Sequence, residues 1–224
     1  MAKIETLKDT FDTAINPAVW GTYGQVSVES GRLRMNSITA YSGAYTQDRY
    51  DLRESAVAVQ IAPAPFAPSR EFSVTVTSIT GDGALMAITG QYGTLFMRRK
   101  QSGNTDSYGD YNPADVWFRI RMTGTTLYWE TSPNGFTWTT QWSATTSSDL
   151  SAVQLELSLG HWGTEVGEPP GYFDNVNTLP AATGWPKVWT GSAWTKKPAK
   201  VWTGSAWVQK PVKVWTGSAW KTVA

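Results

Sequence analysis

Short stretches in which every second residue is apolar run through the first 178 residues of the chain, as in Val57–Ile61, Phe72–Val76 and Val153–Leu159. Successive side chains of a β-strand point to opposite faces of a sheet, so this spacing predicts strands with one buried face. No segment shows a sustained helical period, although Thr13–Trp20 is compatible with one short helical turn. The predicted strands are Val26–Glu29, Arg32–Asn36, Ala56–Ile61, Phe72–Thr77, Leu85–Thr89, Leu95–Arg99, Val116–Met122, Thr126–Thr131, Val153–Leu159 and Tyr172–Val176.

Ten strands with one apolar face each must bury those faces against one another, and two packed antiparallel sheets achieve this. Hydrophobic residues make up 41% of the 224 residues, which is enough for a core at this length. The proline-rich segment 62–69 is predicted to be a surface connection, because proline cannot donate to a central ladder. We therefore expect an all-β chain with a jelly-roll-like antiparallel β-sandwich over residues 1–178.

The hexapeptide WTGSAW occurs three times at intervals of 13 residues, beginning at Trp189, Trp202 and Trp215. Gly-Ser favours a two-residue hairpin loop, since glycine supplies the positive φ of a type II′ turn. Such a loop pairs the first and last tryptophan of each copy across two strands. The predicted pairs are Trp189 with Trp194, Trp202 with Trp207, and Trp215 with Trp220. Residues 179–224 are therefore predicted to form three tandem β-hairpins, with a domain boundary near 178–183.

A lone hairpin of this size is marginally stable in water, so the tryptophan pairs need a partner. They are expected to form a minimal core, to stack on sugar rings, or to mediate oligomerisation or anchoring between chains. Residues 179–224 carry seven lysines and no acidic residue, whereas the preceding 178 residues hold 12 basic and 18 acidic side chains. The lysines are expected to protect edge strands from aggregation, with binding to an anionic wall polymer as the alternative.

The sequence lacks the residues that several kinds of metal, cofactor and nucleic-acid site require. The absence of cysteine excludes disulfides and thiolate metal sites, and a single histidine, His161, excludes a histidine-rich zinc site. No phosphate-binding glycine motif is present, so no cofactor is expected. The lysines of the repeats are unaccompanied by arginine, which disfavours nucleic acid. A loop calcium site at Asp106, Asp110 and Asp115 stays open, although these residues lack EF-hand order.

The N-terminal sequence MAKIETLKDTFD has no apolar segment, so no signal peptide is expected. No apolar run approaches the roughly 20 residues of a membrane span. Glycoside hydrolysis requires two carboxylates that flank the scissile bond, commonly from an E-x-D-x-E strand. No such strand is present, because Glu130 and Glu156 are isolated and Glu165 and Glu168 lie in a Gly/Pro-rich segment. The sequence therefore predicts a non-enzymatic protein, with a glycoside hydrolase or a free carbohydrate-binding module as the alternatives.

One predicted surface combines aromatic and charged residues. If Phe118, Ile120 and Met122 point inwards, their neighbours on the same strand point outwards, and the next strand follows the same rule. Flat rings and bidentate hydrogen-bonding groups suit a sugar, although such a face is equally suited to packing on a subunit or to simple solvation. The candidate carbohydrate-binding residues are Trp117, Arg119, Arg121, Tyr128, Glu130, Glu156, His161 and Trp162.

Three groups of short motifs, taken in their order along the chain, resemble motifs of the concanavalin A-like lectin/glucanase superfamily of jelly rolls. They are Asp9–Asp12 with Asn16–Trp20 and Gly31–Met35; Val116–Arg121 with Leu127–Trp129 and Ser132–Trp138; and Tyr172–Val176. In the second group Asn134 stands where aspartate is commoner. The resemblance covers about residues 5–178 and implies the fold of these lectins and glucanases.

The repeats, of the form K-V-W-x-G-S-A-W with K-P linkers, are similar to those that end minor tail proteins of phages of actinobacteria. This resemblance implies a virion tail component, assembled in the host cytoplasm and released by lysis. Its implied partners are other tail proteins and a host surface glycan, without nucleic acid or a membrane span. Since tail fibres are commonly trimers, a homotrimer is the expected assembly.

Overall fold

The structure is a computed structural model. It describes residues 1–36, 40–62, 70–90, 93–161, 169–179, 187–192, 194–196, 200–210, 212–215 and 220–223. It divides into two compact units, Met1–Thr178 and Leu179–Ala224. Among the described residues, no helix is long and apolar enough to cross a membrane.

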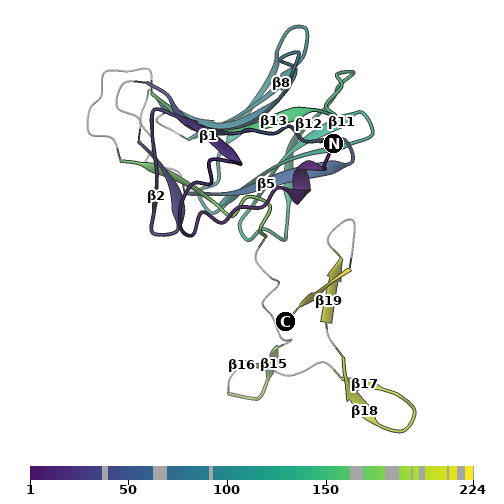
Figure 1. Cartoon of the computed structure of the whole chain (residues 1–224). Coiled ribbons are helices and arrows are strands. Elements are labelled where there is room, and N and C mark those ends of the chain that lie inside the picture. Colours follow the sequence, from purple (N-terminus) through teal and green to yellow (C-terminus); the bar gives the residue numbers. More distant parts are fainter. Residues whose placement is uncertain are drawn as a thin grey trace. The chain divides into compact units, whose positions relative to one another are not determined.

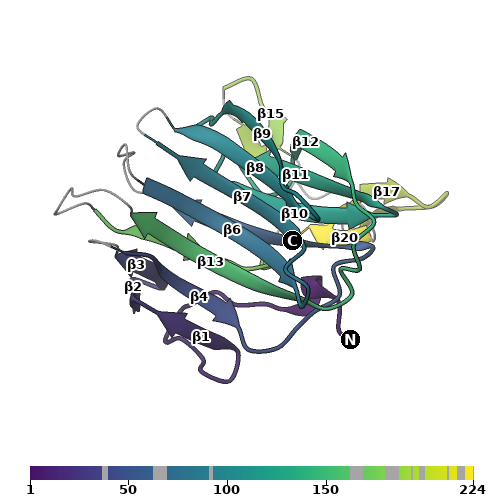
Figure 2. The same ribbon diagram turned by 90° about the horizontal axis from the view of Figure 1, so that it is seen from above.

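Two seven-stranded antiparallel sheets face each other in the larger unit (Figure 1). The first sheet, seen from above in Figure 2, contains in spatial order β1 (Trp20–Tyr23), β4 (Ser42–Thr46), β13 (Val153–His161), β6 (Arg70–Ser78), β7 (Gly83–Thr89), β8 (Thr94–Lys100) and β9 (Thr105–Asp110). The second contains β12 (Thr139–Thr145), β11 (Thr126–Ser132), β10 (Trp117–Thr123), β5 (Ser55–Ala62), β14 (Gly171–Asp174), β3 (Arg32–Asn36) and β2 (Gln25–Glu29). This arrangement confirms the predicted all-β sandwich.

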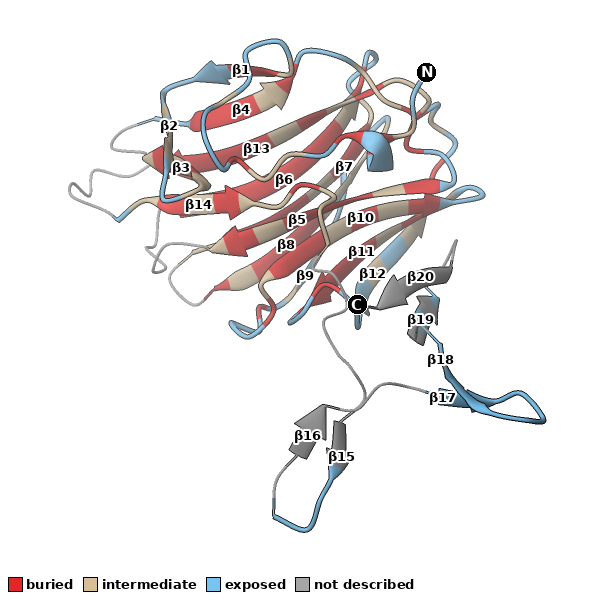
Figure 3. Cartoon of the chain, turned by 60° about the horizontal axis from the view of Figure 1, so that its bottom comes forward, coloured by how far each residue is buried: buried red, intermediate tan, exposed pale blue. Residues whose placement is uncertain are grey.

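The core lies between the two sheets, where Figure 3 shows the buried residues. The alternating residues of β5, β6 and β13 point into it, as predicted, and their apolar side chains are almost fully buried. Phe72 on β6 stacks on Phe173 on β14 with 4.0 Å between ring centroids. The indole Nε1 of buried Trp129 on β11 donates to the carbonyl of Leu85 on β7 at 2.8 Å, so a side chain of one sheet is hydrogen-bonded to the backbone of the other.

Four strands were missed by the sequence prediction, and one predicted strand ends earlier than expected. β1, β4, β9 and β12 were not predicted, because few of their side chains are apolar. Asp106 and Asp110 therefore belong to strand β9 and not to the loop proposed for calcium. The segment Thr13–Trp20 contains one hydrogen-bonded turn, in which the backbone N–H groups of Val19 and Trp20 donate to the Asn16 carbonyl at 3.0 and 2.9 Å, as expected for a single helical turn. The one short helix among the described residues is η1 (Ile4–Thr6). The predicted strand Tyr172–Val176 ends at Asp174, before Asn175 with φ +49°.

The second unit contains three two-stranded sheets: β15 (Lys187–Trp189) with β16 (Trp194–Lys196), β17 (Lys200–Trp202) with β18 (Trp207–Gln209), and β19 (Val212–Trp215) with β20 (Trp220–Val223). Each hairpin pairs the first and last tryptophan of its WTGSAW copy, which confirms the predicted register. Gly191 and Gly204 have φ of +94° and +96°, the left-handed backbone for which glycine is suited.

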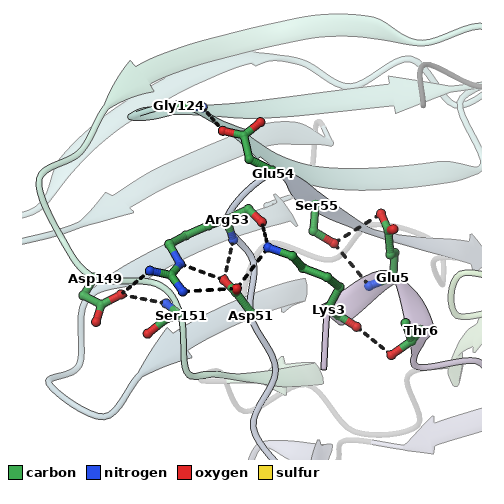
Figure 4. Close-up of polar contacts among 10 residues, drawn as sticks. All are labelled: Lys3, Glu5, Thr6, Asp51, Arg53, Glu54, Ser55, Gly124, Asp149 and Ser151. Carbon is green, nitrogen blue, oxygen red and sulfur yellow. Dashed lines mark hydrogen bonds and ion pairs between the residues drawn. The ribbon is translucent and has the colours of Figure 1, made fainter. Parts of the chain in front are cut away.

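The N-terminal segment is attached to the sandwich by several polar contacts, among which the carboxylate of Asp51 accepts the most hydrogen bonds (Figure 4). Asp51 accepts hydrogen bonds from Lys3 Nζ at 3.0 Å and from the backbone N and Nε of Arg53 at 3.0 and 2.9 Å. These cations, with Arg53 contributing most, lower the pKa of Asp51 to about 2. Ile4 beside this cluster is fully buried, so the contacts hold an apolar residue in the core.

Replacing this carboxylate by Asp51→Asn is expected to lower the free energy of unfolding by about 1–2 kcal/mol near neutral pH. The pKa of Asp51 is depressed from 3.8 to about 2, so its contribution is present above the unfolded value and is lost as pH falls through this window. Urea unfolding followed by tryptophan fluorescence measures the difference between the two proteins. That difference should shrink towards zero near pH ~2; a difference independent of pH would contradict the assignment.

Candidate functional site

Five of the predicted carbohydrate-binding residues lie together on the outer face of the second sheet. In the register of β10 and β11, Arg119 pairs with Glu130 and Arg121 with Tyr128, while Trp117 precedes them on β10. Phe118, Ile120 and Met122 are buried in the core, so the predicted alternation of this strand is correct.

The hydrogen-bonding groups of this face are occupied by one another. Arg119 Nε donates to Glu130 Oε2 at 2.6 Å, and Arg121 Nη2 donates to Glu130 Oε1 at 3.1 Å. The Arg119 guanidinium also lies over the ring of Trp138 at 4.0 Å, and that of Arg121 over the ring of Tyr128 at 3.9 Å. These contacts make a salt-bridge and cation–π network with few groups left for a ligand.

Burial sets the electrostatics of this network. The side chain of Glu130 is 5% exposed and that of Arg119 is 18% exposed. Burial lowers the pKa of Arg119, against the opposing effect of Glu130. Burial alone would raise the pKa of Glu130, but the hydrogen bonds from Arg121 and Arg119 outweigh it and the pKa is lowered. Trp117 is only 1% exposed, so its ring offers no stacking surface.

Glu156 does not join these residues. Its strand, β13, pairs with β4 and β6 in the first sheet, so Glu156 lies on the opposite outer face of the sandwich. The expectation of one surface that combines Glu156 with β10 and β11 is therefore wrong. His161 ends the same strand, β13, while Trp162 lies outside the described residues.

Around Glu156 three tyrosine rings cover glycines of neighbouring strands. A β-carbon added at Gly43 would lie 2.5 Å from Cζ and from the hydroxyl oxygen of Tyr23. The ring of Tyr45 occupies the corresponding space at Gly21, and that of Tyr41 does so at Gly160. We call this set the tyrosine face: Tyr23, Tyr41, Tyr45 and Glu156, with Gly21, Gly43 and Gly160 beneath the rings. The missing side chains of the glycines let the rings lie close to the backbone of the sheet.

The tyrosine face keeps both exposed rings and polar groups. Tyr23 and Tyr41 are 36% and 43% exposed. The Tyr23 hydroxyl donates to Glu156 Oε1 at 2.5 Å, and burial, followed by this bond, raises the pKa of Tyr23. Next to this set, Glu71 pairs in register with Gly160, and burial raises the pKa of Glu71 while Arg98 opposes the shift.

Between Glu156 and Gly160 of the tyrosine face, and on the neighbouring strand β6, the outer surface of the sheet is covered at two serines. Ser158 and Ser73 are 6% and 1% exposed, and their hydroxyls hydrogen-bond at 2.7 Å. At its far end Tyr108 stacks on Phe96 at 5.1 Å, and Arg98 Nε pairs with Asp106 Oδ1 at 2.7 Å. Exposed rings and carboxylates therefore occur at both ends of this sheet. At the far end, Tyr108 is 66% exposed and lies on the same strand as Asp106, whose carboxylate is paired with Arg98. In the tyrosine face, Glu156 has no arginine partner among the described residues and accepts from the Tyr23 hydroxyl.

The three aspartates considered as calcium ligands, Asp106, Asp110 and Asp115, do not form a common site. Asp106 is paired with Arg98, and Asp115 Oδ2 accepts a hydrogen bond from the Thr131 hydroxyl at 2.6 Å. Within the described ranges, no group of three or more His, Asp or Glu side chains is placed to hold a metal ion.

Sequence reasoning did not single out Tyr23, Tyr41 or Tyr45. They lie outside the apolar alternation that predicted the other strands. A usable signal was the interleaving of glycine and tyrosine in Gly21–Gly24 and Tyr41–Tyr45, which is unusual in a strand because glycine weakens it.

No protein-family model and no curated protein matches the chain in sequence. Solved structures match the sandwich. A prokaryotic β-1,3-1,4-glucanase (lichenase) derived from a mouse hindgut metagenome is 10% identical, with a TM-score of 0.59 over 77% of this chain and 99% of its own. A legume lectin-like domain from Entamoeba histolytica is 12% identical, with a TM-score of 0.57 over 79% and 97%. The catalytic domain of an endo-1,3-β-glucanase (laminarinase) from Thermotoga petrophila RKU-1 is 10% identical, with a TM-score of 0.57 over 76% and 94%.

These structures contradict the prediction that the protein is not an enzyme. That prediction rested on the lack of an E-x-D-x-E strand, yet most of the similar structures are glycoside hydrolases, including two further ones, a β-glucanase of Bacillus licheniformis and an endo-β-galactosidase from Clostridium perfringens. At these low identities the likeness concerns the fold. The sandwich of residues 1–178 thus has the jelly-roll fold that these glucanases and the lectin-like domain share.

Proposed function

We propose that the sandwich binds carbohydrate through the tyrosine face. The observation that supports this most directly is the set of tyrosine rings held over glycines beside Glu156. The C–H faces of a pyranose ring pack on aromatic rings, and a carboxylate accepts hydrogen bonds from neighbouring hydroxyls. The solved structures of the same fold include glucanases and a lectin-like domain, and this agrees with a sugar ligand.

The outer face of the second sheet is the weaker candidate. Its carboxylate already accepts from two guanidiniums, each guanidinium lies over an aromatic ring, and Trp117 is buried. A sugar would have to break these contacts before it could make its own. We therefore assign the network on β10 and β11 to stability and the tyrosine face to binding.

The test is affinity electrophoresis and calorimetry of the full chain with β-1,3-1,4-glucan, β-1,3-glucan and other neutral polysaccharides. Tyr45→Ala and Glu156→Gln are each expected to weaken binding by about tenfold, the effect of losing one stacking or charged hydrogen-bonding contact. Tyr108→Ala, at the far end of the same sheet, is the control and should bind normally. Binding that survives Tyr45→Ala and Glu156→Gln would refute this site.

Hydrolysis of the bound sugar is a second candidate, favoured by Glu71. Glu71 is half-buried, and burial raises the pKa of its carboxyl, which is the direction that favours a general acid. Glu71 pairs with Gly160, four residues along β13 from Glu156, which places the backbone positions of the two glutamates ~13 Å apart along the strand. Known glycosidase pairs are closer, at about 5–9.5 Å, so Glu71 would act with a group other than Glu156. Release of reducing ends that disappears in Glu71→Gln would establish this activity; its persistence would exclude Glu71.

We also propose that the protein is a component of a phage tail, with a host surface glycan as the ligand of the sandwich. The support is the similarity of the KVWTGSAW repeats to those of minor tail proteins of phages of actinobacteria. Mass spectrometry of purified virions of the encoding phage should then detect the chain in the tail. Its absence from virions would contradict this role and leave carbohydrate binding untouched.

A further inference from the structure

In the second hairpin the tryptophan pair and one lysine, Lys200, occupy positions on the same side of the two strands. In the second hairpin Trp202 pairs with Trp207, Lys200 with Gln209, and Val201 with Val208. Because alternate residues of a strand share a face, Lys200 lies on the side of the two indoles, ~7 Å along the strand from Trp202. The same interval separates Lys187 from Trp189 and Lys213 from Trp215, and the tryptophans pair in the same register.

The four indoles of the repeats whose side chains the structure describes are exposed and are not buried in a core. Trp189, Trp202, Trp207 and Trp215 are 51–65% exposed. The rings of Trp202 and Trp207 lie 5.7 Å apart and are tilted by 53°. The loop between them is held by Thr203, whose backbone N donates to the Ala206 carbonyl at 3.0 Å and whose hydroxyl accepts from the Ala206 N–H at 3.3 Å. An exposed apolar patch of this kind marks a surface for a partner, and the sequence WTGSAW that forms it occurs three times in the chain.

The charge of the segment identifies the kind of partner. Residues 179–224 hold seven lysines and no acidic residue. Lys200 and Lys213 are exposed beside the tryptophans. A second copy of the segment would bring the same positive charge to the same surface, and like charges at an interface cost free energy. An anionic partner meets the lysines and covers the indoles at once.

We propose that the three hairpins bind an anionic polysaccharide, one acidic sugar to each tryptophan pair and its lysine. The sugar ring packs on the indoles, and its carboxylate or other acid group pairs with the ammonium. Residues 179–224 contain no arginine, which favours an acidic sugar over nucleic acid as the anionic ligand. Three equivalent sites on one chain bind a polymer with a much higher combined affinity than a single sugar.

The test uses the full chain and polygalacturonate as the probe, with binding followed by tryptophan fluorescence and affinity electrophoresis. Lys200→Gln/Lys213→Gln removes two lysines that lie on the tryptophan side. The matched control, Lys210→Gln/Lys221→Gln, removes the same charge elsewhere: Lys221 pairs with Val214, on the other face of its hairpin, and Lys210 follows β18. The first variant is expected to bind about tenfold more weakly and the control within about twofold of the wild type.

Three outcomes overturn the proposal. Equal losses in the two variants would mean general charge attraction without a site. Tighter binding of single-stranded DNA than of polygalacturonate would make the ligand nucleic acid. A concentration-dependent mass with no binding of polymer would mean that a second copy covers the indoles, the trimer expected from the repeats. Tyr45→Ala, which disrupts the site proposed in the sandwich, should leave polygalacturonate binding unchanged. The proposal for the hairpins can therefore be refuted independently of the proposal for the tyrosine face.

Discussion

Replacing Glu130 by glutamine is expected to lower the free energy of unfolding by about 3–5 kcal/mol, the largest loss expected of any charged residue in the sandwich. The Glu130 carboxylate is 5% exposed and pairs with both Arg119 and Arg121. Without its charge, the buried guanidinium of Arg119 keeps its desolvation cost and loses its counter-ion. Denaturant unfolding of the full chain, followed by circular dichroism, measures the loss.

Asp106→Asn is the matched control, because Asp106 also binds one arginine through two hydrogen bonds, at 2.7 and 2.8 Å. Its side chain is 25% exposed, so solvent screens the pair and the expected loss is about 1 kcal/mol or less. The folded fraction of Glu130→Gln should still bind neutral polysaccharide normally. Similar losses in the two variants, or a loss of binding in folded Glu130→Gln, would contradict the structural role of this network.

The strands that could be predicted from sequence are those whose inward positions are large and apolar. β13 is easily recognised in the sequence, because its inward residues Leu155, Leu157 and Leu159 are all large and apolar. β4 has the sequence SGAYT, in which Ala44 points into the core and the outward residues are glycine and tyrosine. Because its inward residues are small or polar, an alternation of large apolar residues does not detect this strand. The hairpins were predictable in register because a turn and its flanking pair are local in sequence.

The candidate site was harder to predict than the strands, because it depends on pairing between distant segments. Alternation shows that Glu156 and Glu130 each point outwards, but it does not tell to which sheet a strand belongs. The pairing of β13 with β4 and β6 decides that Glu156 meets Tyr23, 133 residues away in sequence. The partners of Glu130, in contrast, lie on the adjacent strand of a hairpin and could be anticipated.

Adding a methyl group beneath Tyr23, by Gly43→Ala, is expected to weaken polysaccharide binding by about tenfold while the sandwich stays folded. The new β-carbon would lie 2.5 Å from the end of the Tyr23 ring, which must therefore move. The displaced end belongs to a side chain on edge strand β1, so its movement is expected to cost stability little, about 1 kcal/mol. The Tyr23 hydroxyl loses its hydrogen bond to Glu156, and the ring leaves the position proposed for sugar stacking.

Gly109→Ala in β9 is the control for this substitution, because an added β-carbon there meets no atom within 4 Å. Ultraviolet titration of the tyrosines reports the displacement itself: burial and the bond to Glu156 raise the pKa of Tyr23, so its pKa should fall towards the ordinary value of 10.0 in Gly43→Ala. A lowered pKa together with unchanged polysaccharide affinity would separate Tyr23 from the ligand and leave Tyr41 and Tyr45 as the stacking rings. A lowered pKa together with weakened binding ties the affinity to the placement of the ring, because the substitution removes no aromatic or charged group.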